Sequence, residues 1–273
     1  MLKSILKRVK GRLFLHLRYF LCFRGVSIKS AMNLYLSSVV DVLLHAISGW
    51  EDNPKCLSSG LYLVKPHKFY VYIRGGTDDL YHCLFRREEY VEDLIIHNLE
   101  EGDTFIDVGA NVGYYTLLSS KLVGPEGRVV SIEPVPETFK TLLKNIKINR
   151  ASNIIAAPKA AWNYSTKLKI YIPRKCYGFA SVVRGSLKDE VNIVDAIPLD
   201  DILKGYTKIK LIKIDVEGAE LQVLEGARKT LKKARYVILE VSREEDRIIR
   251  LLKEEGFKIH KLKPATLFAV RKD

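Results

Sequence analysis

The sequence lacks the features that mark several classes of protein. Its four cysteines, Cys22, Cys56, Cys83 and Cys176, form no CxxC pair, which argues against a zinc ribbon, a thioredoxin motif and a disulfide-dense secreted module. No run of about 18 apolar residues is free of charge, so we expect no conventional transmembrane helix. Reduced and mostly packed thiols are typical of a cytosolic protein, which predicts a cytoplasmic location.

Acidic residues are also missing from the first 40 positions, which hold eight Lys and Arg. The chain of 273 residues carries +13 in total, so the rest of it carries 13 − 8 = +5. The body of the protein is therefore only mildly basic. A nucleic-acid partner is less favoured than the total charge suggests.

Residues 2–23 are predicted to form a basic amphipathic helix, with apolar residues on one face and Lys and Arg on the other. Such a helix docks on its own protein body or on a second subunit, which leaves a homo-oligomer open. It can instead lie peripherally on a membrane surface that contains anionic lipid. A second helix is expected over 31–50, so residues 1–50 form a basic helical region.

Residues 51–100 are predicted to form a small region of a β-hairpin plus a helix. Two short strands, 61–64 and 69–73, precede a turn at 74–79 and a helix near Tyr90.

From 101 to 273 the pattern alternates between apolar strands and helices. Strands are expected at 104–108, 128–132, 153–157, 209–214, 236–240, 257–262 and 266–270. Helices are expected at 113–122, 137–149, 219–232 and 244–255. This alternation predicts an α/β fold with a doubly wound, seven-stranded, mainly parallel, Rossmann-like sheet. Only three residues join the last two strands, so they form a hairpin with one antiparallel strand. A hairpin-like segment at 167–172 interrupts the alternation.

A glycine loop follows the first of these strands. Gly109 is expected to allow a sharp turn and the close approach of a ligand, and Gly113 to let the next helix pack near the strand. Asn111 replaces the middle glycine of a GxGxxG loop, which weighs against an NAD-dependent dehydrogenase. Glu133 ends the second strand, 20 residues after Gly113, where an acid can accept both ribose hydroxyls of a nucleoside.

Two further acids, Asp215 and Glu217, follow the fourth strand. Ligands bind at this edge of open α/β sheets, so we expect the Asp215 carboxylate across the site from Gly109. Glu220 is most simply a first-turn helix residue, where the helix dipole favours negative charge.

These segments resemble the FkbM family of S-adenosylmethionine-dependent methyltransferases, which have the seven-stranded class I fold. The resemblance rests on 107–116, Ile132-Glu133-Pro134 and 213–220, which match in order and spacing, and less specifically on 74–79. It covers residues from about 70 to 240 and leaves the first 50 outside.

The resemblance implies a role for each matching residue. Glu133 would bind the ribose of S-adenosyl-L-methionine. The methionine part would be cradled by Asp107, Gly109, Ala110, Asn111 and Gly113. Residues just beyond the third strand would frame the adenine, namely Ala160, Ala161 and Trp162.

The family mostly methylates hydroxyl groups, so the resemblance implies O-methylation of a sugar, glycan, lipid or other small metabolite by in-line methyl transfer. Asp215 and Glu217 would orient or deprotonate the acceptor. They could instead hold a divalent cation that binds a diol, and the sequence leaves this choice open. Two other functions remain open: RNA methylation, and a non-enzymatic cofactor-binding adaptor for a membrane or partner.

Overall fold

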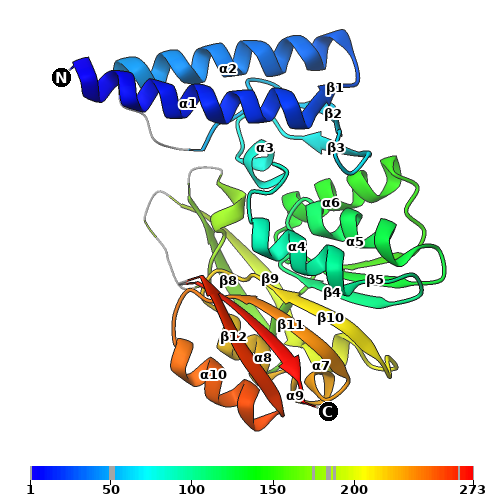
Figure 1. The fold of residues 1–273 in the computed structure, drawn as a ribbon. Coiled ribbons are helices and arrows are strands. Elements are labelled where there is room, and N and C mark those ends of the chain that lie inside the picture. The colour runs from blue at the N-terminus through cyan, green and yellow to red at the C-terminus, as the bar shows by residue number, and fades with distance from the viewer. Residues whose placement is uncertain are drawn as a thin grey trace. The chain divides into compact units, whose positions relative to one another are not determined.

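A computed structural model describes residues 2–48, 53–173, 176–182, 186, 189–263 and 265–272, with side chains for all of these except 2–8 and 48 (Figure 1). The chain divides into two compact units. Unit 1 comprises Met1–Arg87 and Lys175–Gly178, and unit 2 comprises Glu88–Arg174 and Phe179–Asp273.

Unit 1 contains two long helices and a small antiparallel sheet. The helices are α1 (Leu2–Cys22), α2 (Ile28–Ser48) and the short α3 (Asp79–His82). The strands are β1 (Phe23–Gly25), β2 (Gly60–Val64) and β3 (Phe69–Ile73), which pair in that order. Alternate residues of β2 and β3 are buried, as expected for a sheet with one covered face. Tyr62 and Val71 are examples.

One helix of unit 1 differs from the expectation that no segment could cross a membrane. Within α2, Ile28–Ile47 is long and apolar enough to span a bilayer by length and composition, despite Lys29 and Asp41. A core helix of a soluble protein passes the same test, so this property alone assigns no location.

The central sheet of unit 2 has seven strands. They are β4 (Thr104–Val108), β5 (Arg128–Ile132), β6 (Ile154–Ala157), β10 (Ile209–Ile214), β11 (Ala234–Glu240), β12 (Phe257–Lys263) and β13 (Thr266–Arg271). Their order is β12-β13-β11-β10-β4-β5-β6. β13 runs antiparallel to both of its neighbours, and the other pairs are parallel. The α/β class, the doubly wound parallel sheet and the terminal hairpin are confirmed.

Helices cover both faces of this sheet. They are α4 (Glu89–Asn98), α5 (Tyr114–Val123), α6 (Pro136–Ile148), α7 (Leu199–Ile202), α8 (Glu220–Glu225), α9 (Arg228–Leu231) and α10 (Glu245–Glu254). Figure 1 shows α4, α5 and α6 on one face, and α7 to α10 on the other. Because both faces are covered, the central strands are almost continuously buried, which explains their apolar sequences.

The single helix expected at 219–232 is instead two short helices, α8 and α9, separated at Gly226. A β-carbon on Gly226 would lie 1.9 Å from the carbonyl oxygen of Trp162, so another chain segment passes directly against the helix. The carbonyl of Gly226 accepts a hydrogen bond from the N–H of Asp200 at 3.0 Å. This outside partner diverts the backbone from continuous helical bonding.

The segment at 167–172, which was expected to be hairpin-like, is part of a three-stranded sheet. β8 (Thr166–Ile172) pairs with β9 (Glu190–Pro198), which we did not predict, and β9 pairs with β7 (Ala160–Trp162). These strands form a separate three-stranded sheet, in the order β7-β9-β8.

Candidate active site

The end of β4 is closed tightly against the end of β10. Gly109 has a φ of 80°, and a β-carbon there would lie 1.8 Å from the carbonyl oxygen of Asp215. The N–H of Asp215 donates to the carbonyl of Val108 at 3.0 Å. The space on the β-carbon side of Gly109 is therefore filled by the main chain of Asp215, and the approach of a ligand to this glycine stays a prediction.

Gly113 allows two helices, α5 and α6, to pack closely. Its φ is 96°, and a β-carbon would lie 2.6 Å from Cδ1 of Leu142 on α6. The close approach is therefore between the start of α5 and α6, rather than between α5 and the strand. Asn145 of α6 donates from Nδ2 to the carbonyl of Val112 at 2.8 Å, which adds a second tie to the same loop.

Glu133 is held rigidly at the end of β5. One carboxylate oxygen accepts the N–H of Asn111, and the other accepts the N–H of Val135, both at 2.9 Å. The N–H of Ala110 donates to the carbonyl of Ile132 at 3.0 Å. Asn111 has a φ of 50°, and its side-chain oxygen is buried without a hydrogen-bond partner among the described residues. The loop thus wraps around the end of β5 and presents one unused buried acceptor.

Asp107 is buried beneath the loop. One of its oxygens accepts the hydroxyl of Thr116 at 2.6 Å, and Thr116 shares a further hydrogen bond with Ser131 at 2.9 Å. The other oxygen, Oδ1, is buried and has no hydrogen-bond partner in the part of the chain that the structure describes. Burial raises the pKa of Asp107, although Lys213 and the Thr116 hydroxyl favour its ionised form.

Lys213 lies at the centre of the site, and we did not predict a role for it. It is on β10, its side chain is buried, and Nζ donates to Oδ2 of Asp215 at 3.1 Å. Nζ also lies 5.2 Å from the centre of the Tyr115 ring. Burial alone would lower the pKa of Lys213, but Asp215 and Asp107 outweigh burial and raise it. The lysine is therefore a buried cation between two carboxylates.

A group of carboxylates surrounds this end of β10. One oxygen from each of Glu88, Asp215 and Glu240 lies within 4.8 Å of the others. Tyr115 donates its hydroxyl to Glu88 at 2.8 Å. Carboxylate oxygens are suitable ligands for a hard cation, but the Lys213 ammonium already supplies positive charge beside Asp215. Glu240 could have been found from the sequence, because it ends an apolar strand as Glu133 does.

Glu217 does not belong to this group of three among the residues that the structure describes. Its φ is 50°, and its carbonyl accepts the hydroxyl of Ser181 at 2.6 Å. Glu220 begins α8 as expected, but it is buried rather than a simple surface residue. It accepts the N–H of Gly218 at 2.8 Å, and burial raises its pKa.

The three residues implied for the adenine form β7. Ala160 and Ala161 are buried, and Ala161 is part of the main hydrophobic core of unit 2. Trp162 is half-buried, and its indole N–H is buried with no acceptor among the residues that the structure describes. Contact with an adenine stays a prediction for these residues.

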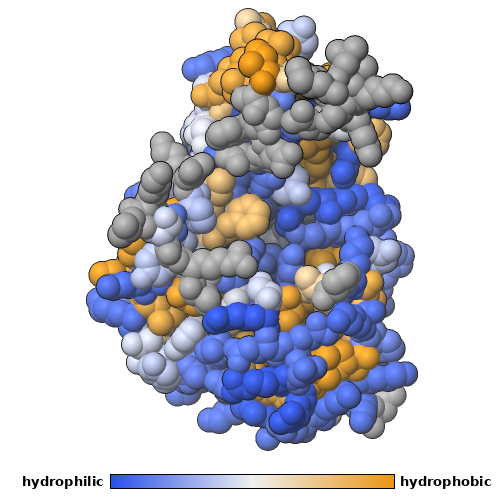
Figure 2. Space-filling model, turned by 90° about the vertical axis from the view of Figure 1, so that its left-hand side faces the viewer, coloured by the Kyte–Doolittle hydropathy of each residue, from blue (hydrophilic) through white to orange (hydrophobic). Residues whose placement is uncertain are grey.

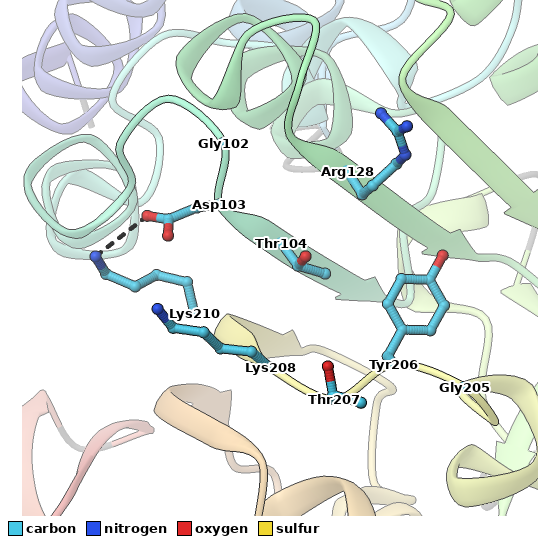
Figure 3. A pocket seen from close by; sticks show the side chains of 9 residues that line it. All are labelled: Gly102, Asp103, Thr104, Arg128, Gly205, Tyr206, Thr207, Lys208 and Lys210. Carbon is cyan, nitrogen blue, oxygen red and sulfur yellow. Dashed lines mark ion pairs between the residues drawn. The ribbon is translucent and has the colours of Figure 1, made fainter.

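A basic pocket lies at the opposite edge of the sheet (Figure 3). Thr104 and Arg128 begin β4 and β5, and Lys210 reaches Asp103 at 3.2 Å. Asp107, Glu133 and Asp215 instead lie at the carboxyl-terminal ends of their strands. This cavity is therefore separate from the candidate active site.

Comparison with known proteins supports the resemblance. Residues 107–259, more than half of the chain, match the family described as Methyltransferase FkbM domain. Methyltransferase sdnD of Sordaria araneosa is 28% identical over 200 residues, which span 60% of this chain and 77% of that protein. Hexuronic acid methyltransferase AglP of Haloferax volcanii is 29% identical over 161 residues, 57% of this chain and 63% of that protein.

A crystal structure of Methyltransferase FkbM from Methylobacillus flagellatus superposes with a TM-score of 0.46 at 16% identity, over 98% of this chain and 60% of that one. The family match includes the glycine loop, Glu133 and the segment from Lys213 to Glu220. The protein is a methyltransferase of the FkbM family.

Proposed function

We propose that this protein transfers a methyl group from S-adenosyl-L-methionine to a hydroxyl oxygen of a sugar, glycan, lipid or other small metabolite. The observation that carries the proposal lies at the carboxyl-terminal edge of the sheet. There the loop held by Glu133 adjoins the Asp215 main chain, and the carboxylates of Glu88 and Glu240 lie beside that of Asp215.

The loop fits the cofactor because it offers buried acceptors for its donors. Within the described parts of the chain, Oδ1 of Asp107 and Oδ1 of Asn111 are both buried without hydrogen-bond partners, as is expected of atoms that bind an ammonium or hydroxyl group. Two backbone N–H groups orient the Glu133 carboxylate, which would accept the ribose hydroxyls of the cofactor. When bound, the cofactor supplies a methyl group on a sulfonium, and the neutral thioether that remains after transfer is a good leaving group.

The acceptor side offers three carboxylates as hydrogen-bond acceptors, and its buried cation, Lys213, is already paired with Asp215. Asp215 would accept the proton of the acceptor hydroxyl, and Lys213 would hold the Asp215 carboxylate in place. Glu88, oriented by Tyr115, and Glu240 would bind neighbouring hydroxyls. A carboxylate acceptor would be repelled by these acids, so a hydroxyl is favoured even if the substrate is a sugar acid, as the name of AglP suggests for that protein.

Two rival functions are less well supported. RNA methylation would bring phosphates towards Glu88, Asp215 and Glu240, whose negative charges oppose them. A purely binding role would not need a carboxylate held in place beside the site, as Asp215 is by Lys213. A divalent cation on the three carboxylates is the remaining alternative to Asp215 as a base.

The first test is calorimetric titration with S-adenosylmethionine and S-adenosylhomocysteine, with NADH as the control. We expect the first two to bind and NADH not to bind. Binding of NADH alone would overturn the cofactor assignment. An acceptor screen with labelled methyl groups then compares the wild type with Asp215→Asn, which should bind cofactor normally but lose turnover.

The same screen tests the remaining alternatives. Turnover that survives EDTA supports the base, and turnover that returns only with added Mg²⁺ supports the cation. Methyl transfer to RNA, with binding that falls steeply as salt rises, would favour the RNA reading.

A further inference from the structure

Helix α2 turns its polar residues towards the protein and its apolar residues outward. Its buried positions follow one helical stripe and are mostly polar, including Ser30, Asn33, Ser37, Ser38, Asp41 and His45. Its exposed positions carry large apolar side chains, including Ile28, Met32, Leu36, Leu43, Leu44 and Ile47. A helix on the surface of a soluble protein has the reverse arrangement.

The polar stripe of α2 is fixed by hydrogen bonds to other parts of unit 1. Asn33 donates to the carbonyl of Ser58 at 2.6 Å and to the hydroxyl of Tyr62 at 2.8 Å. The N–H of Leu57 donates to the hydroxyl of Ser37 at 2.9 Å. The helix cannot rotate to bury its apolar face without breaking these bonds.

A buried ion pair also fixes α1 to α2, with the charged groups between the two helices. Arg12 donates to both oxygens of Asp41 at 2.6 and 2.7 Å, and the ring of His16 lies 2.6 Å from Asp41. Meanwhile Phe14 and Leu21 of α1 are exposed at 64% and 63%. The two helices thus enclose charged groups between them and present hydrocarbon on the outside. Figure 2 shows orange, apolar surface over this part of unit 1.

We propose that the exposed apolar face of α1 and α2 binds the surface of a membrane that contains anionic lipid. Exposed basic residues accompany this face, namely Lys10, Arg24 and Lys29. The first 48 residues contain eight Lys and Arg and one acid, Asp41, so they carry 8 − 1 = +7. Hydrocarbon side chains beside Lys and Arg are the combination that inserts shallowly among anionic headgroups.

The helices would lie along the membrane surface rather than cross it. α2 has 21 residues, or about 31 Å, which is sufficient to span the hydrocarbon layer. However, Asn33 and Ser37 in the middle of α2 bind the irregular main chain at Leu57 and Ser58. A crossing would bring that main chain into hydrocarbon, where irregular backbone is not tolerated against lipid.

Charge also favours lipid over a second copy of the chain. Two copies that met through this face would each bring a segment of +7, whereas an anionic surface attracts it.

The test is flotation of the full-length protein with vesicles of phosphatidylcholine alone and with one third phosphatidylglycerol. We expect binding to both kinds of vesicle, and at least tenfold tighter binding to the anionic kind. A triple variant of the outer face, Leu36→Gln with Leu43→Gln and Ile47→Gln, should weaken vesicle binding at least tenfold. The matched control is Leu143→Gln with Ile155→Gln and Ile193→Gln, which changes equally apolar, exposed residues of unit 2 and should bind as the wild type does.

Melting temperature and S-adenosylmethionine titration establish that both variants are folded, and neither readout depends on turnover. The proposal is wrong if the wild type binds neither kind of vesicle, or if both triple variants bind equally. A lipid-free dimer that only the α2 variant dissociates, without vesicle binding, would assign the face to a second copy. Protection of residues after α2 from protease by sealed vesicles would contradict the surface orientation.

Discussion

The carbonyl oxygen of Asp215 occupies the position that a side chain on Gly109 would need, with 1.8 Å separating it from a β-carbon built there. The two strands that carry the cofactor loop and the acceptor-side carboxylate are thus in contact through their main chains. Since neither segment can shift independently, the geometry of one half of the site determines that of the other.

Gly109→Ala should therefore be strongly destabilising. The substitution adds a clash with main chain to the strain of a positive φ, and we expect a loss of at least about 3 kcal/mol in the free energy of unfolding. Gly102→Ala is the matched control. Gly102 has a φ of 85°, but no described atom lies within 4 Å of its β-carbon position, so only the strain of about 1–2 kcal/mol applies. Equal losses for the two variants in urea titrations would show that the contact with Asp215 is unimportant.

Glu133→Gln should weaken S-adenosylmethionine binding while leaving the fold intact. The amide retains one acceptor oxygen, but its NH₂ group cannot accept the N–H of either Asn111 or Val135. Replacing a charged acceptor of the ribose hydroxyls by a neutral one costs about 1.5–3 kcal/mol of binding free energy, which corresponds to a roughly 10- to 150-fold loss in affinity for S-adenosylmethionine. Calorimetry measures this change. Glu137→Gln, which removes an exposed partner of Lys140, should bind cofactor normally, and an equal effect would remove Glu133 from the site.

Lys213→Met should abolish turnover and destabilise the protein most at neutral pH. Without the buried ammonium, the carboxylates of Asp107 and Asp215 lose their shared counter-charge, at a cost of about 3–5 kcal/mol. Without Lys213 the folded-state pKa of Asp107 would rise further, so the lost stability should return in part as the pH falls and Asp107 becomes protonated. Unfolding titrations at pH 7 and pH 5 test whether the loss of stability is smaller at the lower pH. A deficit that is the same at both would indicate lost packing rather than charge.

Asp107→Asn should stabilise the fold but weaken cofactor binding. Burial raises the folded-state pKa of Asp107 above its unfolded value, so its contribution is favourable below the unfolded pKa and is lost as the pH rises through the folded pKa. At neutral pH the neutral amide should raise the melting temperature by roughly 2–4 °C, equivalent to about 1 kcal/mol, and should weaken cofactor binding. Asp195→Asn, on an exposed carboxylate beside Lys159, is the control and should change neither. A lower melting temperature for Asp107→Asn would contradict the expected stabilisation.

Much of unit 2 was predictable because its parallel strands are buried on both faces. β4, β5 and β10 have the bounds expected from their apolar runs, since such runs end where the chain leaves the core. β9 was missed because its exposed face also carries Val191 and Ile193, which obscures the alternation of an ordinary surface strand.

The site was predictable only where its residues follow one another along the chain. Asp107, the glycine loop and Glu133 come from adjacent strands and form one connected group. Glu88 and Glu240 are far apart in sequence, and only the folded chain brings them to Asp215. Lys213 resembled an ordinary member of an apolar strand, and its role depends on acids that arrive from elsewhere.

β13 follows β12 along the chain, yet it lies between β11 and β12 in the sheet. While a ribosome is still adding Thr266–Arg271, β11 therefore has an unpaired edge, and β12 has no neighbour in the central sheet. The nascent chain must keep that edge from pairing with other chains until these six residues emerge. The order of the strands therefore means that β12 joins the central sheet only after β13 has been synthesised, so the edge of β11 needs protection during synthesis.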